Sequence, residues 1–241
     1  MKKRILIFST LIAVLFGQTI STVHAQSRYD FAAVDKYLAE LKTAETRRTK
    51  STIEPVYQLG KTLAAKSLDD LDSLNETDFN LLNKKMRGFT INREEIIFFE
   101  PVNLFFKSLA IKRGTKSDIA FFSLMRQIRP DDVWAAYIEQ QTDITGCTIY
   151  AGGSLTKPYG NLLRYKSVYP KAYASEIDFE LSEIIAQFSD KTCACGSRAS
   201  VLKEFRLFIK TFPKDKNTPR IKKRLANLEK ETDFRFNCQS G

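Results

Sequence analysis

Two seven-residue stretches of this chain share one pattern, YKSVYPK over Tyr165–Lys171 and FIKTFPK over Phe208–Lys214. Each ends an apolar helical pattern with an aromatic residue and a proline, and proline disfavours helix continuation because it lacks a backbone N–H. The inward positions of the helix that follows each stretch are Ile177, Leu181 and Ile184, then Ile221, Leu225 and Leu228. The pattern therefore predicts two helical hairpins, and each has an apolar face that it must bury on a neighbour.

Helical periodicity also dominates the chain before these hairpins. The apolar run Ile96–Phe99 is interpreted as a helix buried on all sides, and a further helix is predicted after Pro130, carrying Trp134 and Tyr137. The helical pattern ends after Gln141. Apolar and polar residues alternate over Ile144–Tyr150, which indicates a short strand within a small hairpin. We therefore expect an all-α fold, a helical hairpin array, with a short β-hairpin near 144–150.

A known family resembles the second hairpin. The run Val201, Phe205, Phe208, Ile209 and Phe212-Pro213, with the helix after it, is similar to tetratricopeptide-type repeats of bacterial envelope proteins. The spacing of the two hairpins exceeds the roughly 34 residues of that repeat. The resemblance implies a scaffold that binds other proteins.

Residues 1–25 have the pattern of a secretory signal: a basic start, an apolar middle and a small-residue cleavage site at Val23-His24-Ala25. Cleavage near Ala25 predicts a periplasmic or secreted protein without a transmembrane segment. It also removes His24, the single histidine of the chain. Catalysis through a Ser-His-Asp or Cys-His arrangement and histidine-ligated zinc are therefore excluded for the mature chain.

Four cysteines lie beyond that signal, Cys147, Cys193, Cys195 and Cys238. An even number in an oxidising compartment predicts two disulfides. A bond between Cys193 and Cys195 would close a very small, strained ring. Two pairings remain, each tying Cys193 and Cys195 to Cys147 and Cys238 in one order or the other. Both would staple the C-terminal half, so we expect structural disulfides and no metal site.

The positive charge gathers at the end of the chain. Residues 191–241 hold 13 Lys and Arg against 5 Asp and Glu. On the last predicted helix, Arg220, Lys223 and Arg224 face outward together, opposite Ile221 and its apolar neighbours. A solvated face explains such a cluster, and so does binding to a protein or an anionic envelope component. Export argues against nucleic acid as the partner.

Glycine is concentrated between Gly146 and Gly160. Gly152-Gly153-Ser154, ahead of a helix starting near Leu155, could offer backbone N–H groups and Lys157 to an anion. The alternative is an ordinary helix start with Ser154 as its cap. The residues expected to contact a partner in this region are Asp143, Thr145, Tyr150, Lys157 and Tyr159.

These observations predict a signal over 1–25, an N-terminal helical region over 26–141, and a glycine-rich loop with a repeat-like region over 142–241. We expect a binding or scaffold protein of the cell envelope, without a cofactor and without catalytic residues. One alternative is a glycan hydrolase in which Glu139 and Asp143 act as acid and base beside an aromatic ring. Another is a periplasmic immunity or inhibitor protein that uses the glycine-rich loop as a plug.

Overall fold

A computed structural model describes residues 29–130, 133–142, 145–189 and 193–230 of the chain. The predicted signal, Asp143 and Cys238 lie outside the described residues. The helices are α1 (Ala32–Thr46), α2 (Glu54–Ser67), the 3-10 helix η1 (Leu68–Ser73), α3 (Glu76–Lys85), α4 (Asn103–Arg113), α5 (Lys116–Ile128), α6 (Thr156–Val168), α7 (Ala174–Ser189), α8 (Arg198–Thr211) and α9 (Thr218–Lys230). The strands are β1 (Phe89–Asn92), β2 (Phe98–Pro101), β3 (Ile138–Gln140), β4 (Gly146–Ile149) and β5 (Ala194–Cys195).

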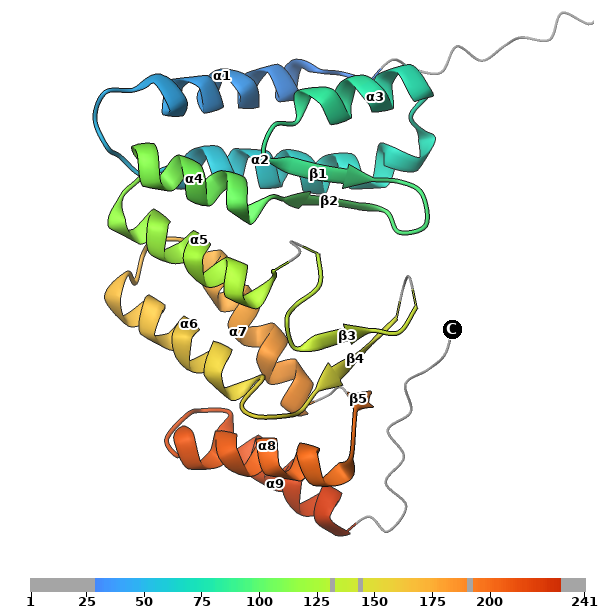
Figure 1. Ribbon diagram of the computed structural model, residues 1–241, viewed down its shortest axis with the longest axis vertical. Helices are drawn as coiled ribbons and strands as arrows, with labels where there is room; N and C mark the ends of the chain where they lie inside the picture. Colours follow the sequence, from blue (N-terminus) through green and yellow to red (C-terminus); the bar gives the residue numbers. More distant parts are fainter. Residues whose placement is uncertain (1–28, 131–132, 143–144, 190–192, 231–241) are drawn as a thin grey trace, which may run out of the picture.

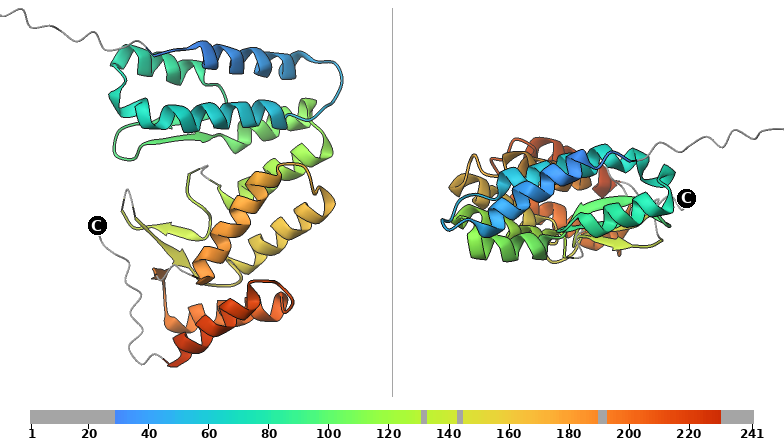
Figure 2. Two further views of the ribbon diagram at one scale, coloured as in Figure 1. Left: turned by 180° about the vertical axis from the view of Figure 1, so that it is seen from behind. Right: turned by 90° about the horizontal axis from the view of Figure 1, so that it is seen from above.

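The helices stack along the long axis of the molecule in roughly their chain order (Figure 1). One end holds α1 and α3, and the other holds α8 and α9, as the view from behind also shows (Figure 2). Buried apolar residues from Val34 to Leu228 form one cluster, which runs across residue 141, where the sequence predicted a boundary between two regions. No helix of the described part of the chain has the length and apolar character that a membrane span requires.

Both predicted hairpins are present, as α6–α7 and α8–α9. Their first helices end alike: Tyr169 has φ −130° and ψ 65°, and Phe212 has φ −124° and ψ 58°. In each case the N–H of the aromatic residue donates to the carbonyl four residues earlier, at 2.8 Å. The shared aromatic-proline pattern therefore marks the same backbone turn in both hairpins.

The fold is mostly helical but not all-α, because the described residues include two small sheets. The Ile96–Phe99 run, which we expected to be a buried helix, leads into β2, and β2 pairs antiparallel with β1 in the register Ile91↔Phe99. The side chains of β2 alternate between half-buried and buried, with Phe99 buried. A run of four apolar residues has no readable period, which is why the sequence did not separate helix from strand.

The helix that we expected after Pro130 does not form in the residues described there, 133–142. Trp134 and Tyr137 lie in an irregular segment that leads into β3. The N–H of Ala136 donates to the carbonyl of Ile128 at 2.6 Å, and the N–H of Ile149 donates to the carbonyl of Tyr137 at 2.8 Å. These long-range bonds hold the segment against α5 and β4 instead of in a helical turn.

The short hairpin near 144–150 is confirmed in the described residues as β3 paired with β4. Strand β4 also pairs in parallel with β5, and Cys147 is bonded to Cys195 across this pair. Of the two pairings that the sequence left open, the structure contains the one with Cys147–Cys195. Cys193 is also disulfide-bonded.

One tyrosine joins the first half of the stack to the second. Tyr173, just before α7, has a left-handed φ of 51° and stacks on Phe121 of α5 with the ring centroids 3.8 Å apart. Its hydroxyl donates to Asp118 at 2.7 Å and its N–H donates to Glu54 at 2.8 Å. Asp118 also caps α5 by accepting from the N–H of Thr115 at 2.6 Å. This buried carboxylate therefore orients α5 and the start of α7 at once.

Candidate binding groove

The glycine-rich loop is folded back onto the body of the protein. Gly152 and Gly153 have φ of 61° and 85°, values that residues with side chains rarely adopt. A Cβ on Gly153 would lie 3.1 Å from Cε of Lys157, so the glycine also leaves room for that side chain. Lys157 is exposed at the surface, as expected for a residue that contacts a partner.

The N-terminus of α6 already holds a carboxylate from within the protein. Glu204, on α8 and 1% exposed, accepts from the N–H of Gly153 at 2.8 Å and from the N–H of Leu155 at 3.2 Å. It also accepts from the N–H and the hydroxyl of Thr156, at 3.0 and 2.8 Å. The anion expected at this loop is therefore supplied by the chain itself. Ser154 does not cap the helix: its hydroxyl accepts from the N–H of Ala151, which lies before the helix, at 3.2 Å, and donates to the carbonyl of Ile149.

Two tyrosines expected to contact a partner belong to the core. Tyr150 is buried and its hydroxyl donates to the carbonyl of Gln187 at 2.6 Å. Tyr159 is buried on α6 and its hydroxyl donates to Asp215, in the α8–α9 turn, at 2.7 Å. Burial raises the pKa of both phenols, that of Tyr150 to about 12. Both aromatic rings are buried in the core, so the prediction that these tyrosines contact a partner does not match their burial.

Of the other predicted contact residues in the described part of the chain, one lies in the β3–β4 hairpin and three lie on α9. Thr145 is half-buried in the β3–β4 hairpin, where its hydroxyl is 2.7 Å from that of Thr142. Arg220 and Lys223 are exposed on α9. Arg224 is half-buried instead of facing outward, and its guanidinium lies 6.0 Å from the ring centroid of Phe205. Of these three cations of α9, Arg220 and Lys223 are therefore the exposed ones.

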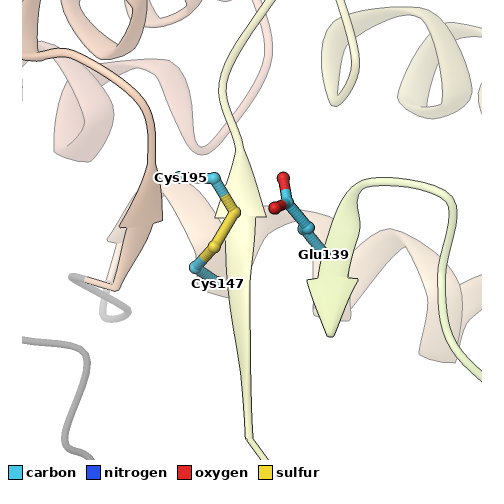
Figure 3. Close-up of side chains that lie close together, drawn as sticks. All are labelled: Glu139, Cys147 and Cys195. Carbon is cyan, nitrogen blue, oxygen red and sulfur yellow. A yellow bond between two sulfur atoms is a disulfide. The ribbon is translucent and has the colours of Figure 1, made fainter. Parts of the chain in front are cut away.

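Glu139, the proposed acid of the hydrolase alternative, is exposed on β3 and not at a helix end. Its carboxylate points toward the Cys147–Cys195 bond (Figure 3), and ligand atoms of the three residues lie within 4.8 Å of one another. Thiolates, not disulfide sulfurs, are the cysteine ligands of metal ions. The cluster therefore cannot hold a metal as a Cys-Cys-Glu set while the disulfide is intact.

A groove between α5 and α6 includes Lys157, one of the predicted contact residues. Two adjoining cavities, of about 350 and 460 Å³, share the lining residues Leu124, Gln127 and Asn161. One reaches the glycine-rich loop at Gly153, and the other reaches Val168 at the end of α6. Ligand-binding clefts of proteins commonly have volumes of this order.

Helical spacing sets the two walls of this groove. Lys157, Asn161 and Arg164 recur at intervals of four and three residues, which places them on one face of α6. Leu124 and Gln127, three residues apart, line the groove from α5. The sequence identified Lys157 but missed the others, since nothing in a single helix shows which neighbour it will face.

The described charged residues that line the groove are all basic. Among the described residues that line it there is no carboxylate, whereas Lys157 and Arg164 bring two positive charges. Neither cation makes an ion pair with another described residue, and the amides of Gln127 and Asn161 make no side-chain hydrogen bond there. The floor is apolar, with Leu124 and Ile128 buried. The groove thus offers apolar contact, free amides and unneutralised positive charge.

Comparison with known proteins finds no matching family model, no matching curated protein and no matching solved structure.

Proposed function

We propose that this protein binds an extended acidic segment of a partner protein in the groove between α5 and α6. The observation that carries the proposal is the composition of the groove: an apolar floor, two amides and two cations, with no carboxylate among its described lining residues. Carboxamides both donate and accept hydrogen bonds, which suits the alternating N–H and C=O groups of a peptide backbone. The cations suit acidic side chains.

The spacing of the cations defines the segment further. Lys157 and Arg164 are seven residues apart on α6, which corresponds to roughly 10 Å along the helix axis. A peptide in the extended polyproline II conformation rises about 3.1 Å per residue and has three residues per turn, so residues i and i+3 lie on the same side of it. Two acidic residues separated by two others would therefore match the two cations, in the pattern acidic-x-x-acidic.

The setting that we propose is the oxidising envelope of a bacterium. The signal pattern over residues 1–25 and the disulfide between Cys147 and Cys195 support this location. The two helical hairpins support a scaffold role of the tetratricopeptide type, in which stacked hairpins present a surface to a protein partner. The basic residues of α9, Arg220 and Lys223, would then help to attract an acidic partner at a distance.

The test is a fluorescence anisotropy titration with two labelled nine-residue peptides. One has Glu at positions 4 and 7, the other has Gln there, and both have Leu and Ala elsewhere. Two exposed ion pairs contribute about 0.4–2 kcal/mol together, so we expect the Glu peptide to bind roughly 2- to 30-fold more tightly. The preference should weaken with added salt.

Variants locate the interaction. Lys157→Gln and Arg164→Gln should each reduce the preference for the Glu peptide, whereas Lys203→Gln, which removes an exposed cation of α8 outside the groove, should leave it unchanged. Equal binding of the two peptides would overturn the proposal. So would binding of polyphosphate without binding of the Glu peptide, a result that points to an anionic wall polymer.

A further inference from the structure

A second cleft is lined by residues of α2, β2, α5 and α7, four elements that Figure 1 labels. Its volume is about 320 Å³. It shares no lining residue with the groove between α5 and α6. Its charged and phenolic lining residues are Tyr57, Lys61, Glu100, Arg129, Glu176 and Glu180.

The cleft holds three carboxylates and two cations, and Glu100 is engaged in an interaction of its own. Glu176 is fully engaged: Lys61 lies 3.3 Å from one oxygen, and Gln58 and Ser175 donate to the other at 2.7 and 2.8 Å. Glu180 is only half engaged. Nε of Arg129 donates to its Oε1 at 2.8 Å.

The second oxygen of Glu180 has no partner. Glu180 is 4% exposed, and its Oε2 is buried without a hydrogen bond to any described group. A buried carboxylate oxygen normally accepts hydrogen bonds, because losing water without replacement is unfavourable. This oxygen belongs to a side chain that lines the cleft.

A second acceptor is offered by Tyr57 of α2, which also lines the cleft. It is 3% exposed, and its hydroxyl makes no hydrogen bond to a described residue. Seven tyrosines are buried in the described part of the chain, and the hydroxyls of five of them donate to an oxygen atom. The other two are Tyr57 and Tyr137. Burial raises the pKa of both, and the negative charge of Glu180 raises it further. Burial raises the pKa of Tyr57, and the negative charges of Glu176, Glu100 and Glu180 raise it further.

We infer that this cleft binds an aliphatic primary ammonium group, which donates to the unpartnered Oε2 of Glu180 and to the hydroxyl oxygen of Tyr57. An ammonium carries three donors and no acceptor, so it matches a site that has spare acceptors. Met125 and the exposed ring of Phe179 line the cleft beside these groups and can contact the methylene chain. This site goes beyond the proposed peptide groove and does not depend on it.

A metal ion fits less well. In the described part of the chain, the one group of three Cys, Asp or Glu ligand atoms within 4.8 Å of one another is at Glu139, Cys147 and Cys195. The three carboxylates of the cleft are therefore too far apart to share one ion. An ammonium on a flexible chain needs no such close convergence.

Calorimetric titration of the full chain with two probes of equal length tests the inference. We expect 1,5-diaminopentane to bind and 1,5-pentanediol to give no saturable signal. Amide chemical shifts should change at Tyr57 and Glu180. Equal affinity for the two probes would overturn the inference, and so would chemical-shift changes confined to other parts of the protein. Neither result requires a purified variant.

Variants then assign the acceptors. Glu180→Gln keeps the shape but removes the charge and should weaken diamine binding at least tenfold, and Tyr57→Phe should weaken it several-fold. Glu139→Gln removes an exposed carboxylate outside the cleft and should bind as the native protein does. Lys157→Gln should also leave diamine binding unchanged, which separates this site from the peptide groove. Unchanged affinity in Glu180→Gln, with a native circular dichroism spectrum, would refute the assignment.

Discussion

Replacing Glu204 with alanine should destabilise the end of the molecule that holds α6 to α9. The carboxylate accepts four hydrogen bonds, three from backbone N–H groups at the start of α6 and one from the hydroxyl of Thr156. The hydroxyl can rotate to another acceptor, but the three N–H groups cannot. A buried donor left without a partner costs about 1–3 kcal/mol.

The expected loss follows from these contacts. Three stranded donors would cost about 3 kcal/mol at the least, and the higher helix propensity of alanine returns about 0.5 kcal/mol. Glu204→Gln keeps one acceptor oxygen and loses the charge, so it should cost about half as much. Lys203→Ala, at the exposed neighbouring position on α8, should change the free energy of unfolding by less than about 0.5 kcal/mol.

Urea unfolding monitored by circular dichroism measures the free energies, and amide hydrogen exchange locates the effect. In Glu204→Ala, the N–H groups of Gly153, Leu155 and Thr156 should exchange faster before any change appears in α1 or α2. If Glu204→Ala is as stable as Lys203→Ala, or if those three amides keep their native protection, Glu204 is not the cap of α6.

Two further predictions concern the same end of the molecule. The paired change Cys147→Ser with Cys195→Ser opens a link across 48 residues and should lower the free energy of unfolding by roughly 4 kcal/mol; a midpoint in urea that is unchanged by the double substitution would contradict this. Burial raises the pKa of Tyr150 from 10 to about 12, so its contribution to stability should be complete below pH 10 and should decline between pH 10 and 12. The difference in unfolding free energy between native protein and Tyr150→Phe should therefore shrink over that interval, and a difference that stays constant would refute the assignment.

The helical part of this fold could be predicted because its signals are local. The aromatic-proline ends at Tyr169 and Phe212 mark two helix termini, and the inward residues repeat with a helical period on either side of them. The strands could not be predicted in the same way. Phe98 and Phe99 form a strand because β1 lies beside them, and an apolar run of this length fits either structure.

The candidate groove was only partly predictable, for a related reason. Lys157 could be identified beside two glycines, but Arg164 and Gln127 became groove residues only when α5 and α6 packed together. Glu204 was missed because 48 residues or more separate it from the N–H groups it accepts from. Carboxylate caps supplied by a distant helix leave no pattern in the sequence.

The contacts of Tyr173 bear on how the polypeptide can be divided for experiment. Its phenol ring and its backbone are held by α5 and by the start of α2, both on the other side of residue 141. A fragment that stops at residue 141 would leave Asp118 without this phenol and would bare the aromatic face of Phe121 to water. Truncation near that residue should therefore yield misfolded pieces, and domain-by-domain dissection is the wrong strategy for this molecule.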